Sequence, residues 1–242
     1  MGKRIRSQRR GRGTNLYRAP SHRYKTEAKY IRSDKDEEEK GRVIDIINDP
    51  SKNAPIGIIE FDNGNRNTMI ISEGTTTKTI IQNGNNAPIK TSNILPLSNI
   101  PEGTAIFNIE AAPGDGGKFI RSSGMFGLIV SRDIKKVVVK MPSKKLKEFH
   151  PLCKATIGIV AGGERKTKPF GFVSAKYYAM KARNKKYPKT SGVAMNSVDH
   201  PFGGSSHPGI PKTTRKTAPP GAKVGSIGAR RTGKKRGKTK IN

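Results

Sequence analysis

The sequence has 242 residues, of which 32% are hydrophobic and none is tryptophan, and its formal net charge is +30. This length allows one large domain or two small ones, and so low an apolar fraction excludes a core that involves the whole chain. Self-repulsion at this charge requires a polyanionic partner, with nucleic acid as the first candidate and an anionic membrane as the second.

The positive charge is unevenly distributed. Residues 1–26 carry nine Lys/Arg and no acid, residues 27–164 carry nineteen basic and seventeen acidic residues, and residues 165–242 carry twenty basic residues and one acid, Asp199. No apolar run approaches the roughly 20 residues that span a bilayer, and no apolar segment of a signal peptide follows the Arg-rich start. The single cysteine, Cys153, cannot form an internal disulfide and fits a reducing cytoplasm. A nearly neutral middle between two polycationic extensions is therefore expected.

Residues 1–40 are predicted to be a basic N-terminal arm with an acidic cluster at its end. Residues 1–26 show no helical or strand periodicity, so they are expected to be disordered alone in water. They are either a solubilising tail or an arm that orders on RNA, with Tyr17 and Tyr24 stacked on bases. The phosphate contacts would then come from Arg4, Arg6, Arg9, Arg10, Arg12, Arg18 and Arg23. The acidic cluster at residues 33–40 is interpreted as solvated surface, with a face for another basic protein as the alternative.

Short β segments predict a small antiparallel barrel over residues 41–110. The expected strands are residues 42–48, 56–62, 67–72, 79–82 and 104–110, with Asn-Gly turns at residues 63–64 and 83–84. Alternation gives as core candidates Ile44, Ile46, Ile58, Phe61, Ile70 and Ile106.

A second barrel is predicted over residues 111–164, with strands at residues 127–131, 135–141, 146–150 and 156–161. The segment 111–119 resembles a phosphate-binding loop only superficially. Ala112 stands where that loop needs glycine and Phe119 where it needs Ser or Thr. We therefore interpret it as the tight connection into the second barrel.

Residues 165–242 are predicted to be a basic extension with one short helix at residues 173–184, which Pro188 stops. Tyr177 and Met180 share one face of this helix, and we interpret them as packing residues. Residues 211–242 are expected to thread along phosphates. The RNA-binding candidates in this extension, outside its central loop, are Lys181, Arg183, Lys185, Lys186, Arg215, Lys216, Lys223, Arg230, Arg231, Lys234, Lys235 and Arg236.

The central loop spans residues 192–209 and can be neither a helix nor an ordinary strand, because Pro201 removes a donor and Gly203-Gly204 permits unusual backbone angles. We interpret it as a fixed loop that fits against phosphate. Its RNA-binding candidates are Met195, Asn196, Asp199, His200, Gly203 and Gly204. A hydrolase would need Ser197, Asp199 and His200 to converge from separate elements, and a metal at His200 and His207 lacks a third strong ligand nearby. No catalytic residue, cofactor or metal is therefore predicted.

Residues 195–204, M-N-S-V-D-H-P-F-G-G, resemble the signature M-N-P-V-[DE]-H-P-[HF]-G-G-G of the large-subunit ribosomal protein L-two family. Ser197 replaces the family's proline, Ser205 replaces its third glycine, and Phe202 is similar to the archaeal and eukaryotic branch. Further blocks follow in family order at residues 95–97, 100–104, 108–110, 113–117, 155–158, 223–225 and 229–233. The resemblance implies a mainly β protein, an OB-fold followed by an SH3-like barrel, with long basic, largely irregular extensions.

The resemblance also implies a function. The chain would be a structural constituent of the large ribosomal subunit, cytoplasmic and not an enzyme. It would bind ribosomal RNA near the peptidyl-transferase region, neighbouring ribosomal proteins, and the small subunit through an intersubunit contact. The alternatives are an extra-ribosomal nucleic-acid packaging protein, which would bind duplex DNA about as well, and an RNA-modifying enzyme, which would need a cofactor loop or a convergent acid/base set.

Overall fold

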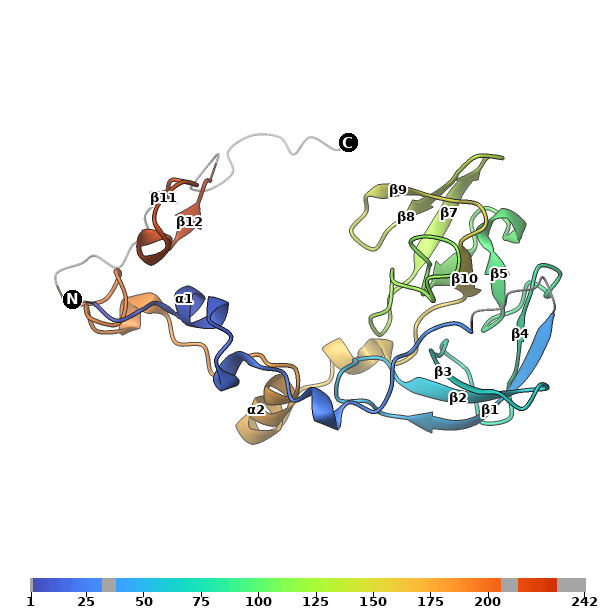
Figure 1. Ribbon diagram of the computed structural model, residues 1–242, viewed down its shortest axis with the longest axis horizontal. Helices are drawn as coiled ribbons and strands as arrows, with labels where there is room; N and C mark the ends of the chain where they lie inside the picture. The colour runs from blue at the N-terminus through green and yellow to red at the C-terminus, as the bar shows by residue number, and fades with distance from the viewer. Residues whose placement is uncertain (1, 32–37, 206–212, 230–242) are drawn as a thin grey trace. The chain divides into compact units, whose positions relative to one another are not determined.

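The computed structural model describes residues 2–31, 38–205 and 213–229 (Figure 1). The chain divides into two compact units. One is Ser21–Gly171, called here the β unit, and the other combines Met1–Pro20 with Phe172–Asn242, called here the extension unit.

The β unit contains one ten-stranded sheet, in the order β3-β2-β1-β4-β5-β10-β6-β7-β8-β9. Its neighbours pair antiparallel, except for β4 and β5, which pair parallel at Asn83 and Ile94. The strands are β1 (Glu39–Ile47), β2 (Ile56–Phe61), β3 (Arg66–Ile70), β4 (Ile80–Asn83), β5 (Ile94–Pro96), β6 (Ala105–Phe107), β7 (Gly127–Arg132), β8 (Val137–Lys140), β9 (Leu146–Phe149) and β10 (Lys154–Ile157). The prediction of a mainly β protein is confirmed.

All nine predicted strands are present in this sheet, with ends that shift by a few residues, and one strand of the sheet was missed. The missed strand, β5, has only three residues and ends in proline, so it shows no alternation. The division into an OB-fold and an SH3-like barrel stays a prediction. One pairing bears on it: β6, expected in the first barrel, pairs with β10 and β7.

The core prediction was wrong at Ile44, whose side chain is 41% exposed. The cause is a β-bulge in β1: Val43 pairs with Ile59 and Asp45 with Ile58, which leaves Ile44 as the extra residue. Val43 is buried in its place. Phe61, Ile70 and Ile106 are buried as expected, and Ile46 and Ile58 are half-buried.

Two hydrophobic clusters hold the β unit together. One centres on β6, β7, β8 and β10 and includes Phe107, Ile109 and Val139. The other lies over β1 to β4 and includes Val43 and Ile59. Two residues upstream of the sheet belong to these clusters, since Ala28 is 1% and Tyr30 6% exposed. The Tyr30 hydroxyl donates to the Asn108 carbonyl oxygen at 2.8 Å and lies 2.7 Å from Thr156 Oγ1.

The extension unit has little regular structure and almost no core. Its elements are α1 (Arg6–Gly11), η1 (Asn15–Tyr17), α2 (Val173–Ala182), η5 (Gly192–Ala194), η6 (Pro220–Ala222), and the parallel pair of two-residue strands β11 (Thr213–Thr214) and β12 (Ser226–Ile227). Its buried hydrophobic side chains among the described residues are Ile5 and Tyr17.

The helix α1 corrects the expectation that residues 1–26 lack helical structure. It was missed because its six residues carry no apolar face. Local signals do delimit it: the Gln8 side chain accepts a hydrogen bond from Ile5 N at 2.9 Å, and Gly13 follows the helix at φ +64°. None of the described helices is long and apolar enough to cross a membrane.

Candidate nucleic-acid interface

The loop that begins at Gly192 is closed by its own backbone. Asn196 O accepts hydrogen bonds from Asp199 N at 3.0 Å and His200 N at 3.2 Å, and Gly203 N donates to His200 O at 2.9 Å. Gly204 N then donates to Met195 O at 3.2 Å, which ties the end of the turn to its start. The loop as far as Ser205 is therefore an ordered turn, while His207, Pro208 and Gly209 lie outside the described residues.

Three glycines allow this closure for two different reasons. A Cβ on Gly203 would lie 2.3 Å from Asn196 O, and a Cβ on Gly192 would lie 2.4 Å from the His200 ring. Gly204 instead adopts φ +106°, a conformation that other residues rarely reach. The sequence predicted a shaped loop with close approach or positive φ, and the structure contains both.

His200 is placed by its neighbours within the loop. Its Nδ1 accepts a hydrogen bond from Phe202 N at 3.1 Å, and its ring lies 5.1 Å from that of Phe202, centre to centre. Because this bond occupies Nδ1, the exchangeable proton of the neutral ring is on Nε2. Nδ1 is thus used in shaping the loop.

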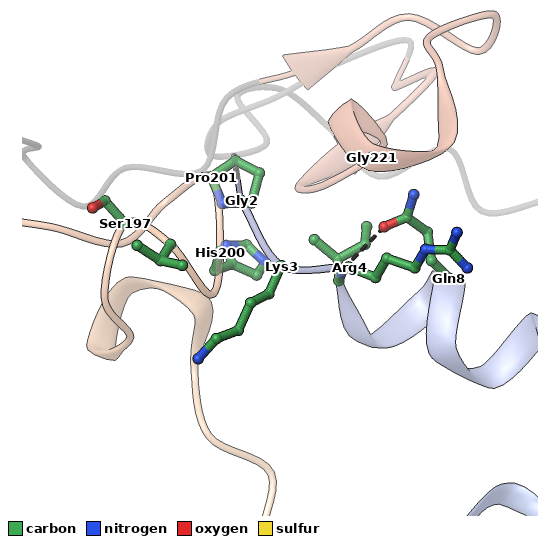
Figure 2. Close-up of a pocket in the computed structure, with 10 residues that line it drawn as sticks. Gly2, Lys3, Arg4, Gln8, Ser197, His200, Pro201 and Gly221 are labelled. Carbon is green, nitrogen blue, oxygen red and sulfur yellow. Dashed lines mark hydrogen bonds between the residues drawn. The ribbon is translucent and has the colours of Figure 1, made fainter. Parts of the chain in front are cut away.

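The N-terminal segment lies against this loop, as Figure 2 shows for Gly2 and Lys3 beside Pro201 and His200. Lys3 N donates to Val198 O at 2.8 Å, and Lys3 Nζ lies 3.0 Å from Asp199 Oδ1. Between them is a pocket of about 300 Å³, which Gln8 and Gly221 also line. Asp199, the sole acid of residues 165–242, is therefore paired with the arm.

A second pocket gathers basic side chains that are far apart in the sequence. It has a volume of about 380 Å³ and is lined by Arg4, Arg6, Arg9, Tyr17, Lys186, Thr190, Ala194, Met195, Asn196 and Asp199. We call it the arginine pocket. Its four cations against one acid, already paired with Lys3, give it a strong preference for an anion. Arginine forks and an amide match the oxygens of a phosphate group.

A third pocket lies between α2 and residues 15–20. Its volume is about 340 Å³, its lining is more apolar than polar, and it contains two aromatic rings. We call it the tyrosine pocket, lined by Asn15, Leu16, Arg18, Pro20, Tyr177, Lys181, Asn184, Lys185, Lys186 and Tyr187. The interpretation of Tyr177 as a packing residue was wrong, because α2 has no buried residue and Tyr177 is 41% exposed.

Ten of the predicted RNA-binding residues line the arginine pocket or the tyrosine pocket. Seven of them line the arginine pocket, and Arg18, Lys181 and Lys185 line the tyrosine pocket. His200 lines the pocket of Figure 2, and Gly203 and Gly204 shape the loop. Arg10, Arg12, Arg183, Arg215, Lys216 and Lys223 belong to the extension unit outside these pockets, and Arg23 belongs to the β unit. Arg230, Arg231, Lys234, Lys235 and Arg236 lie outside the described residues. That these residues bind RNA stays a prediction.

The geometry of Ser197, Asp199 and His200 is not that of a catalytic triad. Nδ1 of His200 is bonded to Phe202 N, and Asp199 is paired with Lys3. Within residues 2–31, 38–205 and 213–229, no three His, Cys, Asp or Glu side chains are grouped as metal ligands would be. Burial and the neighbouring Glu110 carboxylate raise the pKa of the Cys153 thiol to about 11, so it is a poor nucleophile at neutral pH.

Comparison with known proteins gives consistent similarities. Residues 90–224 match the family described as Ribosomal Proteins L2, C-terminal domain. The chain is 55% identical over 238 residues to the large ribosomal subunit protein uL2 of Archaeoglobus fulgidus, which covers 98% of this chain and 100% of the relative. It is 54% identical to the uL2 of Methanococcoides burtonii, over 97% of this chain and 100% of that relative. For the uL2 of Methanothermobacter thermautotrophicus the identity is 50%, over 98% and 100% of the two chains.

Proposed function

The chain belongs to the ribosomal protein L2 family, and from this membership we propose that it is a structural constituent of the large ribosomal subunit that binds ribosomal RNA. Its place of work is then the ribosome in the cytoplasm. Its partners are ribosomal RNA and neighbouring ribosomal proteins. The work is the neutralisation of phosphate and the positioning of RNA segments, and no chemical step is assigned to the protein.

The arginine pocket is the observation that carries this proposal. Arg4, Arg6 and Arg9 come from the N-terminal arm, whereas Lys186 and Asn196 come from the C-terminal extension. A polyanion bound in the arginine pocket contacts the N-terminal arm and the C-terminal extension at the same time. Each phosphate neutralised releases condensed counterions, and this release drives binding. Neither end alone presents this set of donors.

The position near the peptidyl-transferase region and the contact with the small subunit are finer parts of the same proposal. They are supported by the resemblance of residues 195–204 to the family signature. Asn196 lines the arginine pocket, so RNA bound in this pocket lies beside the central loop that carries the family signature. The loop then presents a surface of hydrogen-bonded backbone to RNA.

The test is a pair of double variants of the full chain. Arg4→Gln with Arg6→Gln removes two cations from the arginine pocket, and Lys144→Gln with Lys145→Gln removes two exposed cations from the β unit. Binding to large-subunit ribosomal RNA is measured over a range of KCl concentrations. The slope of log affinity against log salt should become shallower by roughly 0.7–0.9 for each phosphate that the first variant no longer neutralises. The second variant should keep the wild-type slope.

Equal slopes for the two variants would contradict the assignment of phosphate binding to the arginine pocket. A duplex DNA of equal length serves as the competitor in the same titrations. Equal affinity for this DNA and for ribosomal RNA would favour the packaging protein over the ribosomal constituent.

A further inference from the structure

The exposed aromatic side chains of α2 have no role in the arginine pocket. The helix α2, labelled in Figure 1, has no buried residue, although it carries two tyrosines. Tyr177 is 41% exposed and Tyr178 is 66% exposed, and neither lines the arginine pocket. A solvated basic helix needs no tyrosines at these positions. Exposed aromatic rings beside cations are typical of surfaces that bind single-stranded nucleic acid.

The end of α2 brings a second aromatic ring to the first. Asn184 adopts φ +55°, Asn184 N donates to Lys181 O at 3.1 Å, and Lys185 N donates to Met180 O at 2.8 Å. These two bonds and the left-handed residue form a Schellman motif, which ends the helix and turns the chain back. Tyr187 thereby joins Tyr177 in the lining of the tyrosine pocket.

The opposite wall of this pocket is held by the N-terminal arm. The Asn184 side-chain amide donates to Tyr17 O, and Tyr17 is itself buried. Leu16 and Pro20, on either side of Tyr17, line the pocket with apolar surface. The cavity is therefore built from two segments that are far apart in sequence and joined by a hydrogen bond.

The charge of the lining restricts what can bind. Four cations and no acid line the pocket, namely Arg18, Lys181, Lys185 and Lys186. The Lys181 ammonium lies 5.9 Å from the centre of the Tyr177 ring. A planar ligand stacked on that ring is therefore also close to a cation. Lys186 lines the arginine pocket as well. A ligand that joins a flat apolar group to neighbouring anions fits both pockets together.

We propose that the tyrosine pocket takes one unstacked RNA base, held against Tyr177 while its flanking phosphates contact Lys181, Lys185 and Lys186. This inference rests on the proposed binding of ribosomal RNA and names what one site accepts. The cavity of about 340 Å³ is near the lower end of the roughly 300–1,000 Å³ usual for ligand pockets. A paired base in a duplex is stacked on its neighbours and cannot enter, so the ligand is a bulged, looped or terminal nucleotide.

The first test compares two RNAs of equal charge on the full chain. One is a single-stranded RNA of about eight nucleotides, and the other is its abasic analogue with the same backbone. Tyr177→Ala should weaken binding of the first by about five- to 150-fold, the usual effect of losing one stacked base. It should leave binding of the abasic analogue unchanged. Tyr177→Phe, which keeps the ring, should restore the affinity.

Phe172→Ala is the matched control. Phe172 is 78% exposed, immediately precedes α2 and does not line the pocket. This variant should bind both RNAs as the wild type does. If Phe172→Ala weakened binding of the RNA with bases and Tyr177→Ala did not, the proposal would be overturned.

The second test uses the absence of tryptophan from the sequence. Tyr177→Trp introduces the chain's one tryptophan into the pocket, and Phe172→Trp introduces it outside the pocket. The RNA with bases should quench the first and not the second, and the abasic analogue should quench neither. A signal at Tyr177→Trp that responds to other large-subunit proteins and to neither RNA would assign the pocket to a protein contact and overturn the proposal.

These measurements distinguish a wrong assignment of the base pocket from a wrong proposed function. If wild-type chain binds the two RNAs equally and Tyr177→Ala changes neither affinity, phosphate binding stands and the base pocket is wrong. If wild-type chain binds neither RNA, nor the large-subunit RNA, the ribosomal RNA role itself is wrong.

Discussion

Gly203 is the residue at which the signature loop leaves least space. A Cβ there would lie 2.3 Å from Asn196 O and 2.5 Å from Met195 O, and both contacts are backbone atoms. Neither oxygen can turn aside as a flexible side chain could. The loop must open to admit a methyl group, and the bond from Gly204 N to Met195 O is then broken.

We expect Gly203→Ala to impair incorporation of the protein into large subunits while sparing the fold of the β unit. Incorporation is measured as the fraction of the variant that sediments with large subunits, and the fold by circular dichroism. Gly221→Ala is the control, because its nearest contact would be an ordinary 3.5 Å to Gln8 Nε2. Wild-type incorporation of Gly203→Ala would show that the loop tolerates opening and that its closed form is not required.

At this scale the sequence indicates where the backbone is unusual more readily than it shows the reason. The pair Gly203-Gly204 indicates an unusual backbone conformation, but only the folded structure distinguishes the close approach at Gly203 from the positive φ at Gly204. Ile44 shows the opposite case. Strict alternation placed it in the core, and a bulge that local sequence does not mark turned it outward.

Among the elements, the connection from β6 into β7 is ordered by one buried carboxylate. Glu110 is 1% exposed, and its Oε1 accepts a hydrogen bond from Gly116 N at 3.0 Å. Its Oε2 accepts from Gly114 N at 3.3 Å and from Lys154 N at 2.8 Å, the last at the start of β10. The segment that only superficially resembles a phosphate-binding loop thus directs its backbone N–H groups at an internal anion.

Glu110→Gln should destabilise the folded chain by about 1–3 kcal/mol, because the amide nitrogen cannot accept and leaves a buried N–H without an acceptor. The measurement is the midpoint of thermal unfolding. Glu102→Gln is the matched control: Glu102 is exposed and accepts one bond, from Arg132 N at 3.0 Å. That substitution should cost no more than about 0.5 kcal/mol. Equal effects at the two sites would mean that the buried carboxylate does not hold the connection.

Elements with a strong period were predictable, and those defined by distant contacts were not. The strands of the β unit came from runs of Ile and Val and from Asn-Gly turns, and α2 came from good helix formers. No local pattern could show that Tyr177 lines a pocket, because its partners are Leu16, Pro20 and Tyr187. The convergence of arm and extension is tertiary information. The sequence holds one hint of this convergence. Asp199 is the one acid among the basic residues 165–242, and a lone acid there favours a basic partner.

At the scale of the molecule, charge and apolar surface are separated along the chain. Both hydrophobic clusters lie within the β unit, where acidic and basic residues nearly balance. The extension unit carries most of the positive charge and buries few apolar side chains among its described residues. The sequence predicted this division. It placed the start of the folded part at residue 41, whereas Ala28 and Tyr30 are already in the core.

This difference leads to a prediction about fragments. Residues 21–171, expressed alone, should unfold cooperatively without RNA, because they contain both clusters and the hydrogen bonds of Tyr30. Residues 41–171 lack Ala28 and Tyr30. Loss of a buried aromatic ring costs about 3–5 kcal/mol, a large share of the roughly 5–15 kcal/mol that stabilises a domain. In a chain of this size such a loss lowers the melting temperature by about 6–20 °C.

Thermal melts followed by circular dichroism on the two fragments measure that difference. Residues 165–242 provide the contrast, since they should show no cooperative melt until RNA relieves their self-repulsion and offsets the entropy of ordering. A melting temperature for residues 41–171 equal to that of residues 21–171 would contradict the role of Tyr30. A cooperative melt of residues 165–242 without RNA would place a second folding core in the extension unit. The strong positive charge would then have to be tolerated within a stable fold, and RNA would no longer be needed to order it.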